Sequence, residues 1–333
     1  MATTRIEWTR GDDGTAGVVW NPTTGCDRVS PGCDHCYAMT MAKRLKGMGS
    51  PKYQTDGDPR TSGPGFGLAV HSDALALPFK WRKPKRVFVN SMSDLFHARV
   101  PREFVKRVWD VMALTPQHTY QILTKRPDRM ERIVSGFAGS PLPNVWLGTS
   151  IEDQDRAEQR LSHLHATPAA IRWVSCEPLL GPVDLGIGDP HRDHESDDVH
   201  GYPHPRICLT CSPPDDEENE VKYFRREPGS SGLDWVVVGG ESGPGARSMQ
   251  PGWALSLRDQ CAQAGVPFFF KQWGESVAPN HMPEATFMSW DVDNGTSAYD
   301  RDLPWRVGKK RAGRLLDGVL HDAYPAAAVP DAG

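Results

Sequence analysis

Three cysteines lie close together in the segment WNPTTGCDRVSPGCDHCYA and form the pattern C-x6-C-x2-C. They are Cys26, Cys33 and Cys36. Three thiolates can hold three irons of a [4Fe–4S] cluster and leave the fourth iron open for a small ligand. The turn signal Ser30-Pro31-Gly32 can fold the loop around such a cluster. A helix is expected to begin at Cys36, and its free N–H groups favour anionic sulfur. The spacing therefore predicts an iron–sulfur site.

A structural zinc ion, with His or Asp as fourth ligand, is the alternative for these thiols. Zinc sites usually pair one CxxC with a second pair, and no such pair follows here at zinc-finger spacing, so we favour iron and sulfide. The chain has 7 cysteines, and its first residues, MATTRIEWTRGDDG, lack the apolar core of a signal peptide. We therefore expect a cytoplasmic protein with metal ligands or free thiols and no membrane span.

The elements that must position these residues can be read from the apolar runs. Seven short runs rich in Val, Ile, Phe and Trp predict strands: Gly17–Asn21, Arg86–Asn90, Tyr120–Leu123, Val145–Gly148, Ile171–Ser175, Leu233–Val238 and Pro267–Phe270. Helix-like stretches lie between them: Cys36–Lys46, Arg102–Leu114, Asp128–Val134, Gln154–His165 and Trp253–Ala264. Continuous apolar strands alternating with helices are typical of a parallel sheet. The fold class predicted is α/β, as a partial or complete parallel (β/α) barrel.

A polar stretch, Gly186–Ser231, interrupts this rhythm between two late strands. We expect a barrel over residues 1–280, with 186–231 as an insertion and 281–333 as a C-terminal extension. The insertion carries Cys208 and Cys211 as a CxxC, with His200 and His204 upstream. These four residues could hold a zinc ion that folds the insertion. The alternative is a loop without metal, redox-active or disordered.

The chain resembles a phage-associated three-cysteine family of unassigned activity. The segments that carry this resemblance are TGCxxVSPGCxHCYA, VNSMSDLFH, TKRP, SCEPLLGP, VGGESGPGAR and FFFKQWGE. The likeness covers most of Ile6–Glu275. The cysteine loop also resembles that of radical S-adenosylmethionine enzymes, although its first gap is six residues where three is usual. This resemblance implies a barrel of that type, a [4Fe–4S] cluster, S-adenosylmethionine and a reductant for the cluster. It also implies that His35, in the aromatic place before the last cysteine, borders the adenine of the cofactor.

Polar groups follow the predicted strands, at the barrel end where active sites are assembled. The superfamily resemblance implies that Ser91, Ser93 and Asp94 meet the cofactor's amino group. It also implies that Lys125 meets the carboxylate, and that Ser150 and Glu152 meet the ribose. The order Ser, Lys, Ser also resembles spore photoproduct lyase, which repairs thymine dimers. The alternative for each residue alone is helix capping or a surface ion pair.

Later strands supply the candidates for the substrate side, namely Cys176, Glu177, Glu241 and Lys271. A thiol such as that of Cys176 could donate hydrogen to a radical, although a lone cysteine beside a buried strand is more often packing.

The function we expect is a radical enzyme that acts on nucleic acid, in DNA repair or modification. The formal charge of −4 gives no whole-molecule attraction to polyanions. Local basic runs at Lys80–Arg86 (KWRKPKR) and Lys309–Arg314 (KKRAGR), and a mouth lined by Lys125, Arg126 and Lys271, could grip phosphates. Solvated loop edges are the alternative. The competing functions are a metal-stabilised nucleic-acid-binding protein without radical chemistry and a radical enzyme acting on a small molecule.

Overall fold

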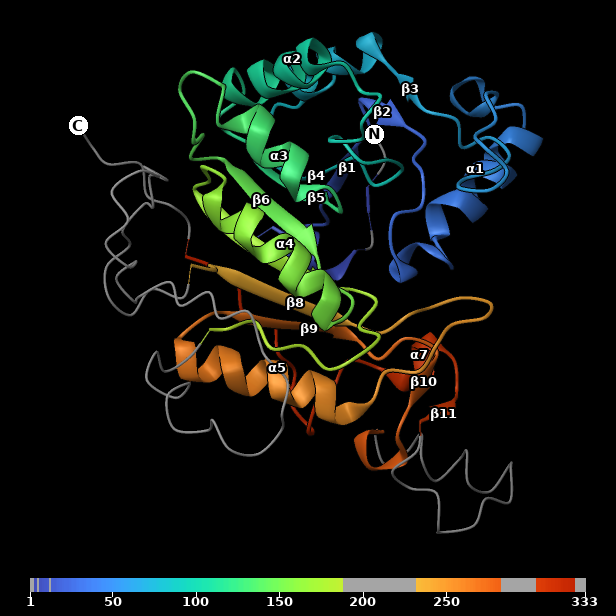
Figure 1. Ribbon diagram of the computed structural model, residues 1–333, viewed down its shortest axis with the longest axis vertical. Coiled ribbons are helices and arrows are strands. Elements are labelled where there is room, and N and C mark those ends of the chain that lie inside the picture. The colour runs from blue at the N-terminus through green and yellow to red at the C-terminus, as the bar shows by residue number, and fades with distance from the viewer. Residues whose placement is uncertain (1–2, 5, 12, 188–231, 283–303, 327–333) are drawn as a thin grey trace, which may run out of the picture.

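A computed structural model describes residues 3–4, 6–11, 13–187, 232–282 and 304–326 of the chain (Figure 1). Its centre is a 7-stranded parallel sheet in the order β1-β4-β5-β6-β7-β8-β9. The strands are β1 Val18–Trp20, β4 Arg86–Val89, β5 Thr119–Thr124, β6 Val145–Ser150, β7 Ile171–Cys176, β8 Trp235–Gly239 and β9 Phe268–Gln272. Each of the seven predicted runs forms one of them.

The sheet curls into a half-barrel whose edges are β1 and β9 (Figure 1). Every residue of β4, β6 and β8 is buried, as expected for strands covered on both faces. The predicted fold class is therefore confirmed, with the partial form of the barrel present. All carboxyl ends of these parallel strands lie at one end of the half-barrel.

The predicted helices are also present, and α2 to α5 follow the strands around the outside of the sheet (Figure 1). They are α1 Tyr37–Gly47, α2 Arg102–Ala113, α3 Pro127–Val134, α4 Gln154–Ala166 and α5 Pro251–Ala264. Local signals set their ends: the Asp153 side chain caps α4 by accepting from the Arg156 amide, and Gly265 ends α5 with a φ of 66°. Their apolar sides form the main core with outward residues such as Val174.

The inner face of the half-barrel is filled by aromatic side chains. Trp146, Trp235 and Phe269 lie at or next to the first residues of their strands, so they fill the amino-terminal end. Trp8, from the 3-10 turn Glu7–Thr9, packs into the same cluster, with its ring centroid 5.1 Å from that of Trp173 and the two rings tilted by 60°. Because aromatic side chains pack the amino-terminal end, the buried polar side chains of the interior gather at the carboxyl end.

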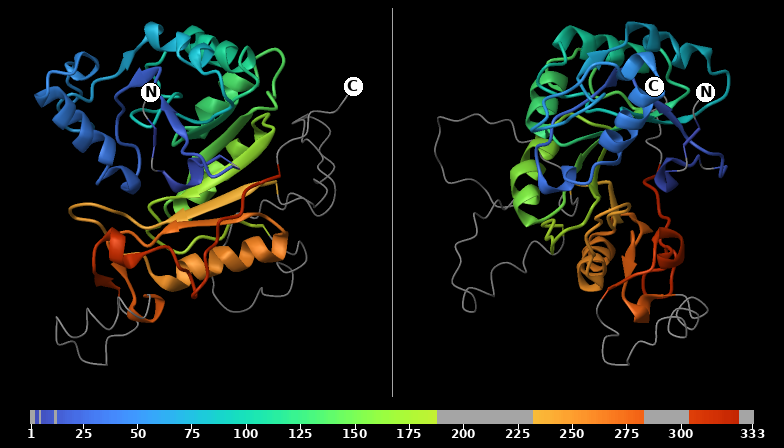
Figure 2. Two further views of the ribbon diagram at one scale, coloured as in Figure 1. Left: turned by 180° about the vertical axis from the view of Figure 1, so that it is seen from behind. Right: turned by 90° about the vertical axis from the view of Figure 1, so that its right-hand side faces the viewer.

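The described part of the C-terminal extension runs beside β9 (Figure 2). The Phe270 amide donates to the His321 carbonyl at 2.8 Å, and Trp235 Nε1 donates to the Ala323 carbonyl at 2.8 Å. Its short elements are β11 Trp305–Arg306, paired with β10 Ser276–Val277, and α7 Lys309–Ala312. A second short pair joins β2 Thr23–Thr24 to β3 Ala69–Val70.

The predicted insertion lies almost entirely outside the described residues, which resume at 232. This includes the proposed zinc ligands Cys208, Cys211, His200 and His204. Within the described ranges, no helix has the length and apolarity needed to span a membrane.

Candidate functional site

The three-cysteine loop runs from β1 to α1 and lies on the carboxyl ends of the strands. Its start is fixed by Thr23, whose hydroxyl is hydrogen-bonded to that of Ser93 at 2.8 Å, and by the Gly25 amide, which donates to the Met92 carbonyl at 3.0 Å. Gly25 has a φ of 83°, and a Cβ there would stand 2.2 Å from the Gly67 carbonyl oxygen. A side chain at this position would therefore clash with the backbone at Gly67, and the positive φ also favours glycine.

The thiols of the loop lie in mostly apolar surroundings. Cys33 is buried, and Cys26 and Cys36 pack against a small cluster that contains Ala38 and Met92. Burial raises the pKa of Cys26 to about 12 and also raises the pKa of Cys36. Within the described ranges, no three Cys, His, Asp or Glu side chains are gathered closely enough to chelate a metal ion.

Several N–H groups are nevertheless directed at the sulfur atoms. Arg126 donates to Cys26 Sγ at 3.4 Å, and the Ala38 and Met39 amides act on Cys36 in the sense that favours its thiolate. Neutral thiols in an apolar pocket have no need of such donors, whereas metal-bound thiolates do. In their chemistry, the three cysteines and these donors fit an iron–sulfur group.

Asp94 and Arg126 form a buried pair beside Cys26. Arg126 donates to Asp94 Oδ2 at 2.9 Å and to the Asp27 carbonyl at 3.0 Å. Asp94 also accepts from the Thr124 hydroxyl at 2.7 Å and from the Lys125 amide at 3.1 Å. The pair thereby connects the loops after β4 and β5 to the cysteine loop.

Glu152, after β6, is fully buried and is surrounded by three donors. Its carboxylate accepts from Lys125 Nζ at 2.5 Å, from Ser30 Oγ at 2.8 Å and from Arg160 at 2.9 Å. Burial raises the pKa of Glu152, but the nearby Lys125 and Arg160 outweigh burial and hold it below its ordinary value. A Cβ on Gly32 would lie 2.5 Å from Glu152 Oε1, so the loop can approach this carboxylate only with glycine there.

Glu241, after β8, fastens the other side of the cysteine loop. It accepts from His35 Nδ1 at 2.9 Å and from Arg247, whose side chain also donates to the Pro31 carbonyl at 2.8 Å. Burial raises the pKa of Glu241, yet the hydrogen bonds from Arg247 and His35 lower it to about 2. Glu241 is therefore a carboxylate anchor for the loop in this structure.

Glu177 and Lys271 form an ion pair of 2.9 Å at the ends of β7 and β9. The second Glu177 oxygen accepts from Trp8 Nε1 and from Ser175 Oγ, each at 3.1 Å. A Cβ on Gly239 would lie 2.6 Å from Glu177 Oε1, so the neighbouring strand is also shaped around this carboxylate. Cys176 lies between Ser175 and Glu177, whose side chains face the interior of the half-barrel. Its own side chain faces outward into the main core and is fully buried. Its thiol thus has the environment of the packing alternative, and burial raises its pKa.

The mouth differs from the free positive surface expected from the sequence. Its cations Lys125, Arg126 and Lys271 are each paired with a carboxylate. The run Lys80–Arg86 leads into the start of β4, so it lies at the opposite end of the sheet and does not extend this mouth. Its Trp81 is buried against His118 and unavailable for base stacking.

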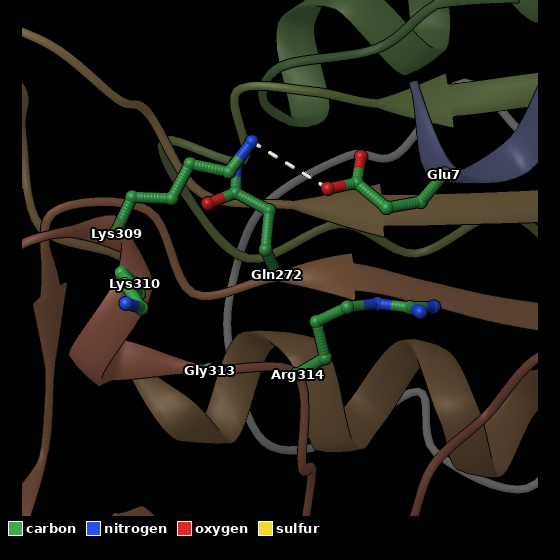
Figure 3. A pocket seen from close by; sticks show the side chains of 6 residues that line it. All are labelled: Glu7, Gln272, Lys309, Lys310, Gly313 and Arg314. Atoms are coloured by element: carbon green, nitrogen blue, oxygen red, sulfur yellow. Dashed lines mark ion pairs between the residues drawn. The ribbon is translucent and has the colours of Figure 1, made fainter. Parts of the chain in front are cut away.

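The second basic run, Lys309–Arg314, lies at the carboxyl end of β9. Residues of this run line an open hollow of about 360 Å³ together with Glu7 and Gln272 (Figure 3). Lys309 Nζ lies 3.6 Å from Glu7 Oε1, and the exposed Lys310 also lines the hollow. Gln272 is buried, and its Oε1 has no hydrogen-bond partner among the described residues.

The structure therefore places most predicted site residues at one end of the half-barrel. Contacts join the cysteine loop directly to Ser93, Glu152 and Glu241, and Tyr37 donates to the Ser91 carbonyl at 2.5 Å. Ser150 is buried, and its carbonyl accepts from Arg160 at 2.7 Å. Sequence reasoning missed Arg160, which lies within α4 and carries no local signal. It also missed Asp27, which is held by His97 at 2.9 Å.

One of three comparisons with known proteins gave a match. A family model described as "Protein of unknown function (DUF5131)" matches residues 3–325. Neither a search of curated proteins nor a search of solved structures gave a match. Because the matching model spans nearly the whole chain, the half-barrel and its cysteine loop lie within the matched region. This chain therefore belongs to the DUF5131 family.

Proposed function

We propose that this protein is a radical S-adenosylmethionine-type enzyme acting on nucleic acid. The observation that carries the proposal is the position of Cys26, Cys33 and Cys36, on a loop fastened to the carboxyl ends of a parallel half-barrel. Three thiolates would hold three irons of a [4Fe–4S] cluster. When bound, a reduced cluster with S-adenosylmethionine supplies a 5′-deoxyadenosyl radical that abstracts hydrogen from a substrate.

The protein's own groups would position the cofactor. Lys125 carries the charge that suits a carboxylate, and Glu152 holds its ammonium at 2.5 Å. The buried Ser150, at the end of β6, and Ser91, beside the cysteine loop, are the hydroxyls proposed for the ribose and amino group. His35 is proposed to border the adenine by its ring face while Glu241 holds Nδ1. Each contact places a group; none requires Lys125 or Glu241 to change its charge.

The substrate side is assigned to Glu177 and Lys271. Their pair is mostly buried, with exposed side-chain fractions of 12% and 19%. Trp8 donates to Glu177 and fills the interior on its amino-terminal side. Water is therefore excluded from the pair on that side. Within this pair, Lys271 can hold a proton at Nζ and Glu177 can accept one at Oε1.

Nucleic acid is favoured as substrate by the basic hollow beside β9, where Lys310 is exposed (Figure 3). Of the other cations that line it, Lys309 pairs with Glu7 and Arg314 pairs with Asp322. The hollow lies at the carboxyl end of β9, the end that also carries the cysteine loop, so a bound phosphate there would be near the mouth. A reacting base would have to leave its stack to enter the half-barrel. A small-molecule substrate is the second candidate, because the three mouth cations are already neutralised by carboxylates.

Metal analysis of anaerobically purified protein tests the proposal. We expect a brown protein with about four irons and a broad absorbance at about 400 nm. Replacing Cys26, Cys33 or Cys36 with Ala should remove the colour, whereas Cys261→Ala, in the buried face of α5, should keep it. A colourless wild-type protein that binds one zinc and takes up no iron on reconstitution would rule the proposal out. That result would favour a metal-stabilised binding protein without radical chemistry.

A further inference from the structure

Arg126 follows β5 and directs its guanidinium at the first cysteine. Its side chain is 13% exposed, and one terminal nitrogen donates both to Cys26 Sγ at 3.4 Å and to Asp94 Oδ2 at 2.9 Å. The other nitrogen donates to the Asp27 carbonyl at 3.0 Å. Three contacts from two separate loops therefore fix the orientation of the group.

We propose that Arg126 raises the reduction potential of an iron–sulfur cluster bound through Cys26. The inference rests on the proposed function, since it requires that cluster. Reduction adds one negative charge to the cluster. A fixed cation close to a ligand sulfur stabilises the reduced state more than the oxidised state, and an N–H···S hydrogen bond acts in the same direction.

Asp94 sets the limit of this effect. Its carboxylate lies 2.9 Å from the Arg126 nitrogen and opposes the cation, whereas the hydrogen bond to Cys26 Sγ comes from Arg126. Asp94 and Arg126 carry opposite charges close to the same sulfur, so they act on a cluster bound there in opposite senses. Removing Asp94 alone should therefore have the opposite effect on the potential to removing Arg126 alone.

Arg129, in the first turn of α3, provides a control three residues after Arg126. It is also an arginine in partly buried surroundings, but its guanidinium donates to the His97 and Val100 carbonyls and to no cysteine of the described ranges. Arg129→Gln should leave the potential of the cluster at the wild-type value. A change of overall charge alone is thereby separated from the effect at Cys26.

The test is an electron-paramagnetic-resonance potentiometric titration of reconstituted protein. We expect the midpoint of Arg126→Gln to shift to more negative potential and that of Asp94→Asn to shift to more positive potential. The double variant, which removes both charges, should fall between them. An exchangeable proton coupled to the reduced cluster should also disappear from the pulsed-resonance spectrum of Arg126→Gln.

The possible failures are distinguishable. If Arg126→Gln retains a full complement of iron and its midpoint equals that of wild type, the inference is wrong while the proposed function stands. If Arg126→Gln does not retain the cluster, Asp94→Asn decides, because that variant keeps the cation and an unchanged midpoint would overturn the inference. A wild-type protein that forms no cluster overturns the proposed function itself.

Discussion

Glu241 accepts a hydrogen bond from His35 across 2.9 Å, although the two residues are 206 positions apart in the sequence. Glu241 lies in the loop after β8, late in the chain, and His35 lies between the second and third cysteines. With the contact between Ser30 and Glu152, this bond holds the cysteine loop at two distant strands of the half-barrel. The position of the loop is thus fixed by the sheet, and the loop does not depend on α1 alone.

Replacing Glu241 with Gln should loosen the cysteine loop. The variant loses the charge that faces Arg247 and keeps one acceptor for His35, so we expect faster hydrogen–deuterium exchange over residues 30–36. Glu131→Gln is the control, because Glu131 pairs with His163 on the outer helices at 2.7 Å. If exchange in the loop is the same in Glu241→Gln, Glu131→Gln and wild type, Glu241 does not anchor the loop.

The same anchor should depend on pH. Hydrogen bonds from Arg247 and His35, working against burial, hold the pKa of Glu241 at about 2, below its ordinary value of 4.5. A depressed pKa stabilises the folded state above the ordinary value, and this contribution is lost as the pH falls from about 4.5 toward 2. The difference in unfolding free energy between wild type and Glu241→Gln should be on the order of 3 kcal/mol at neutral pH and should shrink below pH about 4.5. A difference that stays constant from pH 6 to about 3 would contradict this prediction.

Gly32 should tolerate no side chain. A Cβ there would meet Glu152 Cγ and Oε1 at 2.5 Å, and Glu152 cannot move freely because Lys125 and Arg160 hold it. Gly32→Ala is therefore expected to lower the thermal unfolding midpoint and to reduce iron incorporation. Gly47→Ala, at the end of α1 with nothing within 4 Å, should leave iron incorporation unchanged and be neutral or slightly stabilising. Equal iron contents in the two variants would show that the close approach at Gly32 has no role in the site.

The basic hollow beside β9 should contribute to binding of nucleic acid. If Lys309 and Lys310 contact phosphates, affinity for single-stranded DNA should fall with salt, and the slope of log affinity against log salt should decrease by roughly 0.7 for each lysine replaced by Ala. The control is Arg82→Ala with Lys83→Ala, two exposed cations at the opposite end of the sheet. A slope reduced by the control pair and unchanged by the Lys309 and Lys310 variants would move the binding surface to that end.

The fold was largely predictable because its signals are local. Runs such as Trp235–Gly239 are continuously apolar, as strands buried on both faces must be, and each is followed by a helix or turn signal. The alternation of side chains along a strand also indicates which face Cys176 occupies. Ser175 faces the interior, so period two places Cys176 on the outer face, where the structure has it. The basic run Lys80–Arg86 comes directly before the strand that begins at Arg86. This sequence order likewise places the run at the amino-terminal end of the sheet.

The site was less predictable because its contacts are long-range. The three cysteines and the strand-end residues could be named from local pattern, but their partners could not. Ser30 and Glu152 are 122 positions apart, and Trp8 and Glu177 are 169 positions apart. No spacing rule indicates that the mouth cations would each find a carboxylate, or that Trp8 would fill the interior from the N-terminal segment.

The most direct test of the radical-enzyme proposal is formation of 5′-deoxyadenosine. Reconstituted protein should be reduced anaerobically with dithionite, mixed with S-adenosylmethionine and analysed for the nucleoside by mass spectrometry. We expect its formation by wild type and its loss in Cys26→Ala, Cys33→Ala and Cys36→Ala, with Cys261→Ala remaining active. Wild-type protein that carries a complete, reducible cluster and yet forms no 5′-deoxyadenosine, with or without added DNA or RNA, would contradict the proposal.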